Sequence, residues 1–134
     1  MTVQEAIEDA ERILPGEPAP DGEIDPRWQA IIAVGFFIPT DGEAVWAFIQ
    51  RWGCHENEDL RTGIATCLLE DLLDERFEEF FPKVEAAVRA SALFADTFAR
   101  CWKIGEAKQP GNAERFDRLK RECRFVMARA PTEL

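Results

Sequence analysis

The chain has 134 residues, of which 26 are acidic and 16 basic, so its formal net charge is −10. This length suits one domain with a core, and 46% hydrophobic residues exclude a disordered or fibrous chain. No apolar run approaches the roughly 20 residues that cross a bilayer, and the first residues lack a signal-peptide pattern. We therefore expect a cytoplasmic protein. The net negative charge separately opposes binding to anionic membranes or nucleic acid.

The first predicted helix covers residues 2–14. Thr2 and Glu5 have the spacing of a capping box, and an apolar stripe with helical spacing follows them. Residues 15–24 are rich in proline and glycine and cannot continue this helix, so we expect an extended linker there.

A helical domain is expected over residues 25–134. It begins with Asp25 as a helix cap and Pro26 at the first helical position, which is a preferred helix start. We expect Pro82 to kink or restart its helix, because proline removes a backbone hydrogen bond. No alternating strand pattern competes. Apolar residues at helical spacing predict helices over 27–38, 43–52, 57–74, 77–88, 91–102 and 112–129.

An internal period of 34 residues is visible in the helical domain. The order Asp-x-Arg in Asp25-Pro26-Arg27 recurs in Asp59-Leu60-Arg61, 34 positions later, and we expect Asp25 and Asp59 to be the caps of equivalent helices. A period of this size is typical of an α-solenoid, in which stacked helix pairs share one core. An irregular helical bundle with accidental spacing is the alternative. At the same interval, small residues coincide at Ala33, Cys67 and Cys101.

Segments 25–35 and 59–69 resemble the second helix of HEAT-type repeats, which tends to run Asp, hydrophobic, Arg, then paired small and aliphatic residues. The third unit departs from this pattern, with Leu93 and Ala95 in place of the acidic and basic residues. The resemblance covers about residues 25–105. It implies an all-α fold, a short superhelix of about three helix pairs with an extra N-terminal helix, and a surface that binds another macromolecule.

Cysteine and histidine usage gives little support to catalysis. Cys54, Cys67, Cys101 and Cys123 lie far apart without a CxxC motif, so we interpret them as reduced, packed thiols rather than a disulfide or metal set. His55 follows Cys54, but adjacent side chains rarely face each other as a nucleophile and its base do. Nucleotide, hydrolase and metalloprotease motifs are absent from the sequence, so we expect no enzyme and no cofactor.

Acidic residues are densest between positions 70 and 79. They share helical faces if one helix persists there, which leaves a paired-carboxylate hydrolase or a divalent-cation cage as an alternative. Because leucine and phenylalanine occupy the opposite side, we interpret the carboxylates as a solvated face that is a candidate for partner binding. The candidate residues are Glu70, Asp71, Asp74 and Glu78.

Charge is segregated along the chain. Residues 1–25 contain 8 acidic and 1 basic side chains, whereas residues 92–134 contain 6 acidic and 9 basic ones. The basic end is a candidate site for an acidic protein, for RNA or for the acidic end of a second copy, although its own carboxylates could neutralise it. The candidate residues are Lys103, Lys108, Arg115, Arg118, Arg121 and Arg124.

Two functions follow from these observations. The leading hypothesis is a non-enzymatic helical-repeat protein that binds another protein, with nucleic acid reached only through the basic C-terminal helix and a second copy as a further candidate partner. The alternative is a small acidic inhibitor, of the immunity or antitoxin type, that neutralises a basic toxin. Ionic strength distinguishes them, because association steered by charge slows steeply as salt is added.

Overall fold

The chain is all-helical, with no strand, over residues 1–129, which are those that the structure, a computed structural model, describes. The all-α fold class predicted from the sequence is confirmed. The α-helices are α1 (Val3–Ile13), α2 (Pro26–Gly35), α3 (Gly42–Gly53), α4 (Glu58–Ile64), α5 (Glu70–Glu75), α6 (Phe77–Ala90), α7 (Ala92–Ala99) and α8 (Pro110–Arg129). A π-helical turn, η1 (Ala65–Leu69), joins α4 to α5, and a 3₁₀ turn, η2 (Gly105–Lys108), precedes α8.

Three helix starts are set by the capping side chains that the sequence predicts. The Thr2 hydroxyl accepts a hydrogen bond from the N–H of Glu5 at 3.1 Å, and α1 begins there. Asp25 caps α2 and Ser91 caps α7 in the same manner. No helix forms between α1 and α2, where the sequence predicts the linker. Local capping chemistry therefore determines where these elements begin.

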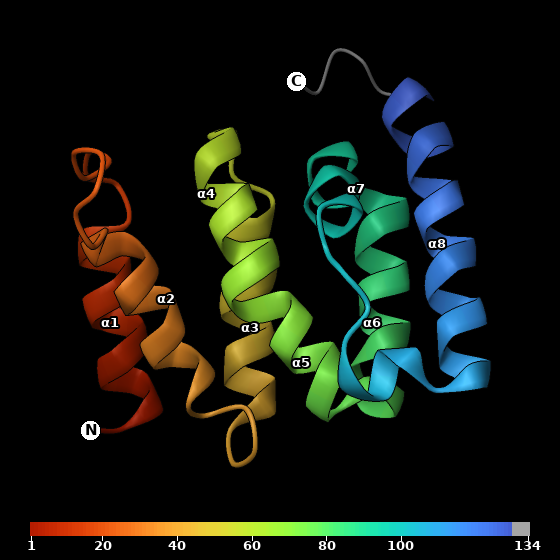
Figure 1. The fold of residues 1–134 in the computed structure, drawn as a ribbon, viewed down its shortest axis with the longest axis horizontal. Helices are drawn as coiled ribbons and strands as arrows, with labels where there is room; N and C mark the ends of the chain where they lie inside the picture. The colour runs from red at the N-terminus through yellow and green to blue at the C-terminus, as the bar shows by residue number, and fades with distance from the viewer. Residues whose placement is uncertain (130–134) are drawn as a thin grey trace.

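Helices α1 and α2 lie at one end of the molecule and α8 at the other, with α3 to α7 between them (Figure 1). α1 packs mainly on α2, α3 packs on α4, and α6 packs on α7. α8 lies against both α7 and α6. Helix α1 is therefore the partner of α2 across the linker, and α8 is the helix that has no partner after it in the described chain.

The core runs along the whole series of helices. Its densest part is a group of buried phenylalanines from α6, α7 and α8. The rings of Phe77 and Phe81 stack at 4.5 Å between centroids, and those of Phe98 and Phe116 lie 4.8 Å apart. Burial of several such side chains, at about 2–3 kcal/mol each, dominates the attachment of α8.

The helix that carries the second Asp-x-Arg segment starts at a different cap from the one expected. Asn57 caps α4, since its side chain accepts from the N–H groups of Asp59 and Leu60. Asp59 lies inside the first turn instead, and its carboxylate accepts from Arg27 of α2 at 2.7 Å. The expectation that Asp25 and Asp59 are equivalent caps is therefore wrong. The shared Asp-x-Arg order reflects an ion pair between helices, not two equivalent caps.

The helix break near the acidic segment occurs at Arg76, not at Pro82. Arg76 has φ −140° and ψ 49°, which ends α5, whereas α6 continues through Pro82. Only one backbone hydrogen bond is lost at a proline in the second turn of a helix. At Arg76 the guanidinium donates to the carbonyl of Ile38 at 2.9 Å, and Glu106 accepts the first free N–H of α6, that of Phe77. Contacts from distant segments thus hold the break.

Helix α7 is shorter than the predicted helix over 91–102. It ends at Ala99, and the chain then runs extended to η2. Cys101 remains buried, but Trp102 is 76% exposed instead of contributing to the core. The N–H of Trp102 donates to a carboxylate oxygen of Glu70 at 2.9 Å, which fixes the extended segment against the first turn of α5.

Candidate interaction surface

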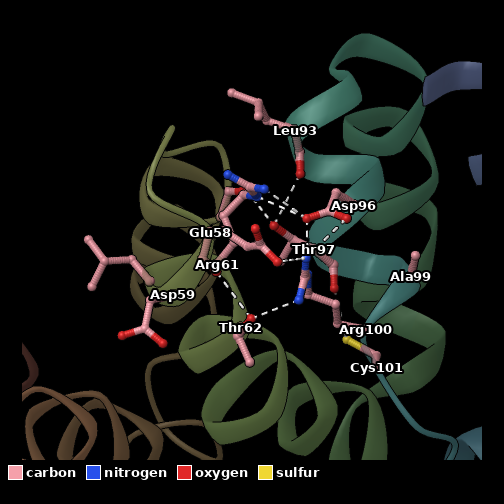
Figure 2. A network of polar contacts seen from close by, with 12 residues as sticks. Glu58, Asp59, Arg61, Thr62, Leu93, Asp96, Thr97, Ala99, Arg100 and Cys101 are labelled. Carbon is pink, nitrogen blue, oxygen red and sulfur yellow. Dashed lines mark hydrogen bonds and ion pairs between the residues drawn. The ribbon is translucent and has the colours of Figure 1, made fainter. Parts of the chain in front are cut away.

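A network of charges joins α4 to α7 (Figure 2). The guanidinium of Arg61, whose side chain is 7% exposed, donates through Nε and Nη2 to Asp96 at 3.1 and 2.9 Å. Its Nη1 donates to the carbonyls of His55 and Glu56 at 3.0 and 2.9 Å. This buried cation is therefore held on all sides by oxygen acceptors.

Arg100, at the end of α7, extends the network to the surface. It donates to Asp96 at 3.0 Å, to the hydroxyl of Thr62 at 3.0 Å and to Glu58 at 2.8 Å. Burial opposes ionisation of Asp96, but hydrogen bonds from Arg100 and Arg61 outweigh it and hold the pKa of this carboxyl below its usual value. Asp96 is therefore charged at neutral pH and shared between two arginines.

The equivalent cation between α2 and α4 is Arg27, also buried. It donates to Asp25 at 2.9 Å and to Asp59 at 2.7 Å, and in Figure 2 Asp59 points away from the Arg61 network. The hydrogen bond from Arg27 lowers the pKa of Asp25. Next to it, the ring of Trp28 fills the space where a side chain at Gly63 would lie. Both buried arginines are thus committed to helix packing.

The turn that contains Cys54 and His55 is occupied by structural contacts. Nδ1 of His55 accepts from the N–H of Asn57 at 3.0 Å, and its ring stacks on Trp52 with 5.5 Å between centroids.

The two buried cysteines, Cys101 and Cys123, are not reactive thiols. Burial raises the pKa of the Cys101 thiol, and it raises that of Cys123 to about 12. These two thiols are therefore protonated at neutral pH and are weak nucleophiles.

The predicted acidic set is divided by the structure. Glu70, Asp71 and Asp74 lie on α5, where burial raises the pKa of Glu70 and Asp71. Glu78 lies beyond the break at Arg76, on α6, and pairs with Arg115 of α8 at 3.3 Å. The shared face that the sequence suggests for residues 70–79 therefore does not form.

Several members of the predicted basic set are neutralised by carboxylates of the same chain. Lys103 pairs with Asp117 at 2.9 Å, and Arg118 lies 3.6 Å from Glu114. Arg115 pairs with Glu78 and also covers the ring of Phe81. Lys108 at the end of η2 and Arg121 and Arg124 on α8 are exposed and form no such pair within residues 1–129.

Two adjoining hollows lie where α8 passes the end of α7, and we call them together the α7–α8 groove. Their volumes are about 370 and 340 Å³, and Ala99 and Lys120 line both. The ammonium of Lys120 donates to the carbonyl of Ala99 at 2.7 Å, which orders the floor of the groove. The first hollow is also lined by Thr62, Thr66, Arg100, Cys101 and Trp102, and the second by Arg121, Cys123, Arg124 and Met127. An exposed indole and a cluster of cations thus share one groove.

The sequence analysis did not identify Trp102 or Lys120 as site residues. Trp102 fits the apolar spacing of the helix predicted over 91–102, and only the early end of α7 exposes it. Lys120 belongs to the basic helix, but nothing local shows that it points toward Ala99 rather than to solvent. The sequence signal for this groove was limited to Arg121 and Arg124.

Comparisons with protein-family profiles, with curated proteins and with solved structures found no match to the chain. In residues 1–129, no helix has both the length and the apolar character needed to cross a bilayer. The same part of the chain contains no group of three His, Cys, Asp or Glu side chains placed to hold one metal ion.

Proposed function

We propose that the chain is a short α-solenoid of HEAT-like helix pairs that binds another protein in the cytoplasm and catalyses no reaction. Ion pairs between successive helix pairs support the solenoid. The first helices of the pairs are joined by Glu11 with Arg51 and by Glu43 with Lys83, each spanning 40 positions. The repetition of one contact at one interval is what stacked equivalent units produce.

The second helices of the pairs are linked in a parallel series. Arg27 of α2 binds Asp59 of α4 across 32 positions, and Arg61 of α4 binds Asp96 of α7 across 35 positions. Arg27 and Arg61 are 34 positions apart and both are buried, which matches the period in the sequence. The third unit has Ala95 at the position of these two arginines, so α7 has no equivalent arginine to bind α8 and the series of ion pairs ends at α7.

The observation that carries the binding function is Trp102 in the α7–α8 groove. A tryptophan that is 76% exposed leaves a large apolar surface in water, and tryptophan is among the residues that contribute most to protein interfaces. Lys120 and Arg124 line the same groove. A protein segment with an apolar anchor and neighbouring carboxylates fits this combination, and such a partner complements the local positive charge.

The test is a selection of peptides from a random display library on the folded chain, followed by affinity measurements with Trp102→Ala and Arg124→Glu. We expect selected peptides to be acidic with an aromatic or aliphatic residue, and Trp102→Ala to weaken their binding about 30-fold or more, as for an interface hot spot. Phe36→Ala and Arg12→Glu are matched controls, because both side chains are exposed and lie outside the groove.

Selected peptides also shift the tryptophan fluorescence when they bury Trp102, and the loss of this shift in Trp102→Ala separates it from the signal of the other three tryptophans. Peptides that bind Trp102→Ala and the natural chain equally well would place the binding surface elsewhere. A selection that returns only basic peptides would argue against the groove as well.

The alternative, an acidic inhibitor, draws on the carboxylates of α5. Burial, followed by repulsion from Asp74, raises the pKa of both Asp71 and Glu75, so this surface would gain from a cationic partner. Basic peptides whose binding is lost in an Asp71→Asn, Glu75→Gln double variant and weakens steeply with salt would support it. The same selection therefore distinguishes the two functions.

A further inference from the structure

An apolar groove is lined by residues of α1 and α2, and we call it the α1–α2 groove. These two helices lie at the end of the molecule opposite α8 (Figure 1). Its volume is about 470 Å³. Met1 and Ile24 at its rim are 74% and 77% exposed. The apolar side chains that line it include Ala6, Ile13, Ile24, Pro26, Ala30 and Ala33.

This groove faces away from the remainder of the fold. Residues two positions apart on an α-helix point about 200° apart. On α1, Glu11 points to Arg51 of α3, so Asp9 and Ile13, which line the groove, lie on the opposite side. On α2, Trp28 packs on α4, and Pro26 and Ala30 point away from it. The groove therefore occupies the place where a preceding helix pair would stack.

The opposite end of the molecule exposes the outer face of α8. Phe125 is 67% exposed there. Arg118 and Arg121 lie seven and four positions before it, and helical spacing puts all three on one face. Phe116, Leu119 and Cys123 are buried on the other face of α8. This end thus presents an apolar anchor flanked by cations.

The two ends also have complementary charge. Residues 1–25 contain 8 acidic and 1 basic side chains, and α1 carries Glu5, Glu8 and Asp9, of which Asp9 lines the groove and pairs with Arg12. Residues 92–134 contain 9 basic and 6 acidic ones. Opposite charges favour approach of the α8 end of one copy to the α1 end of another, and disfavour contact between like ends.

We propose that the α1–α2 groove binds the outer face of α8 from a second copy of the chain, so that copies associate head to tail. Phe125 of one copy fills the apolar groove of the next, and Arg118 and Arg121 lie against the carboxylates of α1. The interface joins two different surfaces, so a pair of copies still has one free groove and one free α8 face, and the association continues along a series. This inference does not rest on the α7–α8 groove as a binding site.

The test is the weight-average mass of the full chain by sedimentation equilibrium, from about 1 to about 200 µM at about 50 mM salt. We expect the mass to rise with concentration above the 15.2 kDa of one copy. Ile24→Glu and Phe125→Glu each keep the chain at one copy, because each removes one half of the contact. Both side chains are exposed, so the fold tolerates either change. Trp102→Glu, which alters an exposed aromatic that lines neither the α1–α2 groove nor the outer face of α8, is the matched control.

Mixing the two variants gives the decisive result. Ile24→Glu keeps a functional α8 face and Phe125→Glu keeps a functional groove, so the mixture forms one-to-one pairs and stops there. A chain that remains at one copy over the whole range overturns the proposal. Association that persists in either variant, or a mixture that forms no pairs, overturns it too.

Discussion

The charges around Arg61 and the charges on α5 lie close together in the chain but are arranged in opposite ways. Around Arg61, cations and carboxylates alternate, and every one of the groups Arg61, Asp96 and Arg100 has oppositely charged partners. On α5, Asp71, Asp74 and Glu75 repel one another, and burial raises the pKa of Asp71 and Glu75. Ion pairs with arginines lower the pKa of Asp96, whereas Asp71 and Glu75 have no such partner and their pKa values stay raised.

This difference indicates which charges are available to a partner. The groups around Arg61 are satisfied inside the chain, so removing one leaves another buried without compensation. The charged forms of Asp71 and Glu75 on α5 are already disfavoured, so a cation that neutralises them would stabilise this surface. Buried, alternating charges therefore hold neighbouring helices together here, whereas the like charges of Asp71 and Glu75 mark a surface that no ion pair ties to the rest of the described chain.

Asp96→Ala should have the largest effect. It leaves the guanidinium of Arg61 buried without its carboxylate, and we expect the free energy of unfolding to fall by about 3 kcal/mol. Urea denaturation followed by circular dichroism measures this. The control is Glu58→Ala, because the side chain of Glu58 is 71% exposed where it pairs with Arg100. This change should lower the free energy of unfolding by at most about 0.5 kcal/mol. Equal losses in the two variants would contradict the structural role of the buried pair.

Gly105→Ala should come second and tests how α5 is held without paired charges. Gly105 has φ +53°, and an added Cβ would lie 1.3 Å from the Oδ1 of Asp74. We expect a loss of about 2 kcal/mol in the free energy of unfolding, since both the backbone and the packing of η2 on α5 are strained. Gly111→Ala is the matched control, because nothing lies within 4 Å of its added Cβ. If both substitutions are neutral, η2 does not hold α5.

The smallest effect is a dependence of stability on pH. Asp71 and Glu75 have folded pKa values above their ordinary 3.8 and 4.5, so stability is gained as pH falls through those folded values. Asp96 has a folded pKa below its ordinary 3.8, so its contribution is present above pH 3.8 and is lost as pH falls through the folded value. We expect the melting temperature to rise from pH 7 toward these ordinary values and to fall again below pH 3.8, which thermal unfolding followed by circular dichroism at a series of pH values measures.

The Asp71→Asn variant separates the two contributions. It should raise the melting temperature at pH 7 and remove part of the gain on acidification, while the loss below pH 3.8 remains. A natural chain that loses stability steadily from pH 7 downward would show that the α5 carboxylates are not repelling one another. An Asp71→Asn variant less stable than the natural chain at pH 7 would lead to the same conclusion.

Most of the helix starts could be predicted from the sequence because their causes are local. Thr2, Asp25 and Ser91 bond to N–H groups two or three residues ahead, and this spacing is visible in the chain. The apolar spacing of α8 similarly predicts its buried face, including Phe116. These elements depend on neighbours within one or two turns.

The features that sequence analysis missed depend on distant contacts. The break at Arg76 rests on Ile38 and Glu106, which are 38 and 30 positions away from it. Trp102 is exposed because its N–H binds Glu70, 32 positions earlier. The α7–α8 groove depends on contacts between distant segments of this kind, such as that between Lys120 and Ala99. The sequence therefore identified only its two exposed arginines, Arg121 and Arg124.

The ion pairs between helices have a consequence for how the chain folds. In the described part of the chain they join residues 32 to 42 positions apart, so each closes a loop shorter than a third of the chain. Most of the other close contacts join residues fewer than 12 positions apart, and a fold rich in local contacts is expected to form rapidly. Because each helix mainly contacts its neighbours in the chain, the two ends can open independently, and hydrogen exchange should be fastest in α1 and α8 and slowest in the helices between them.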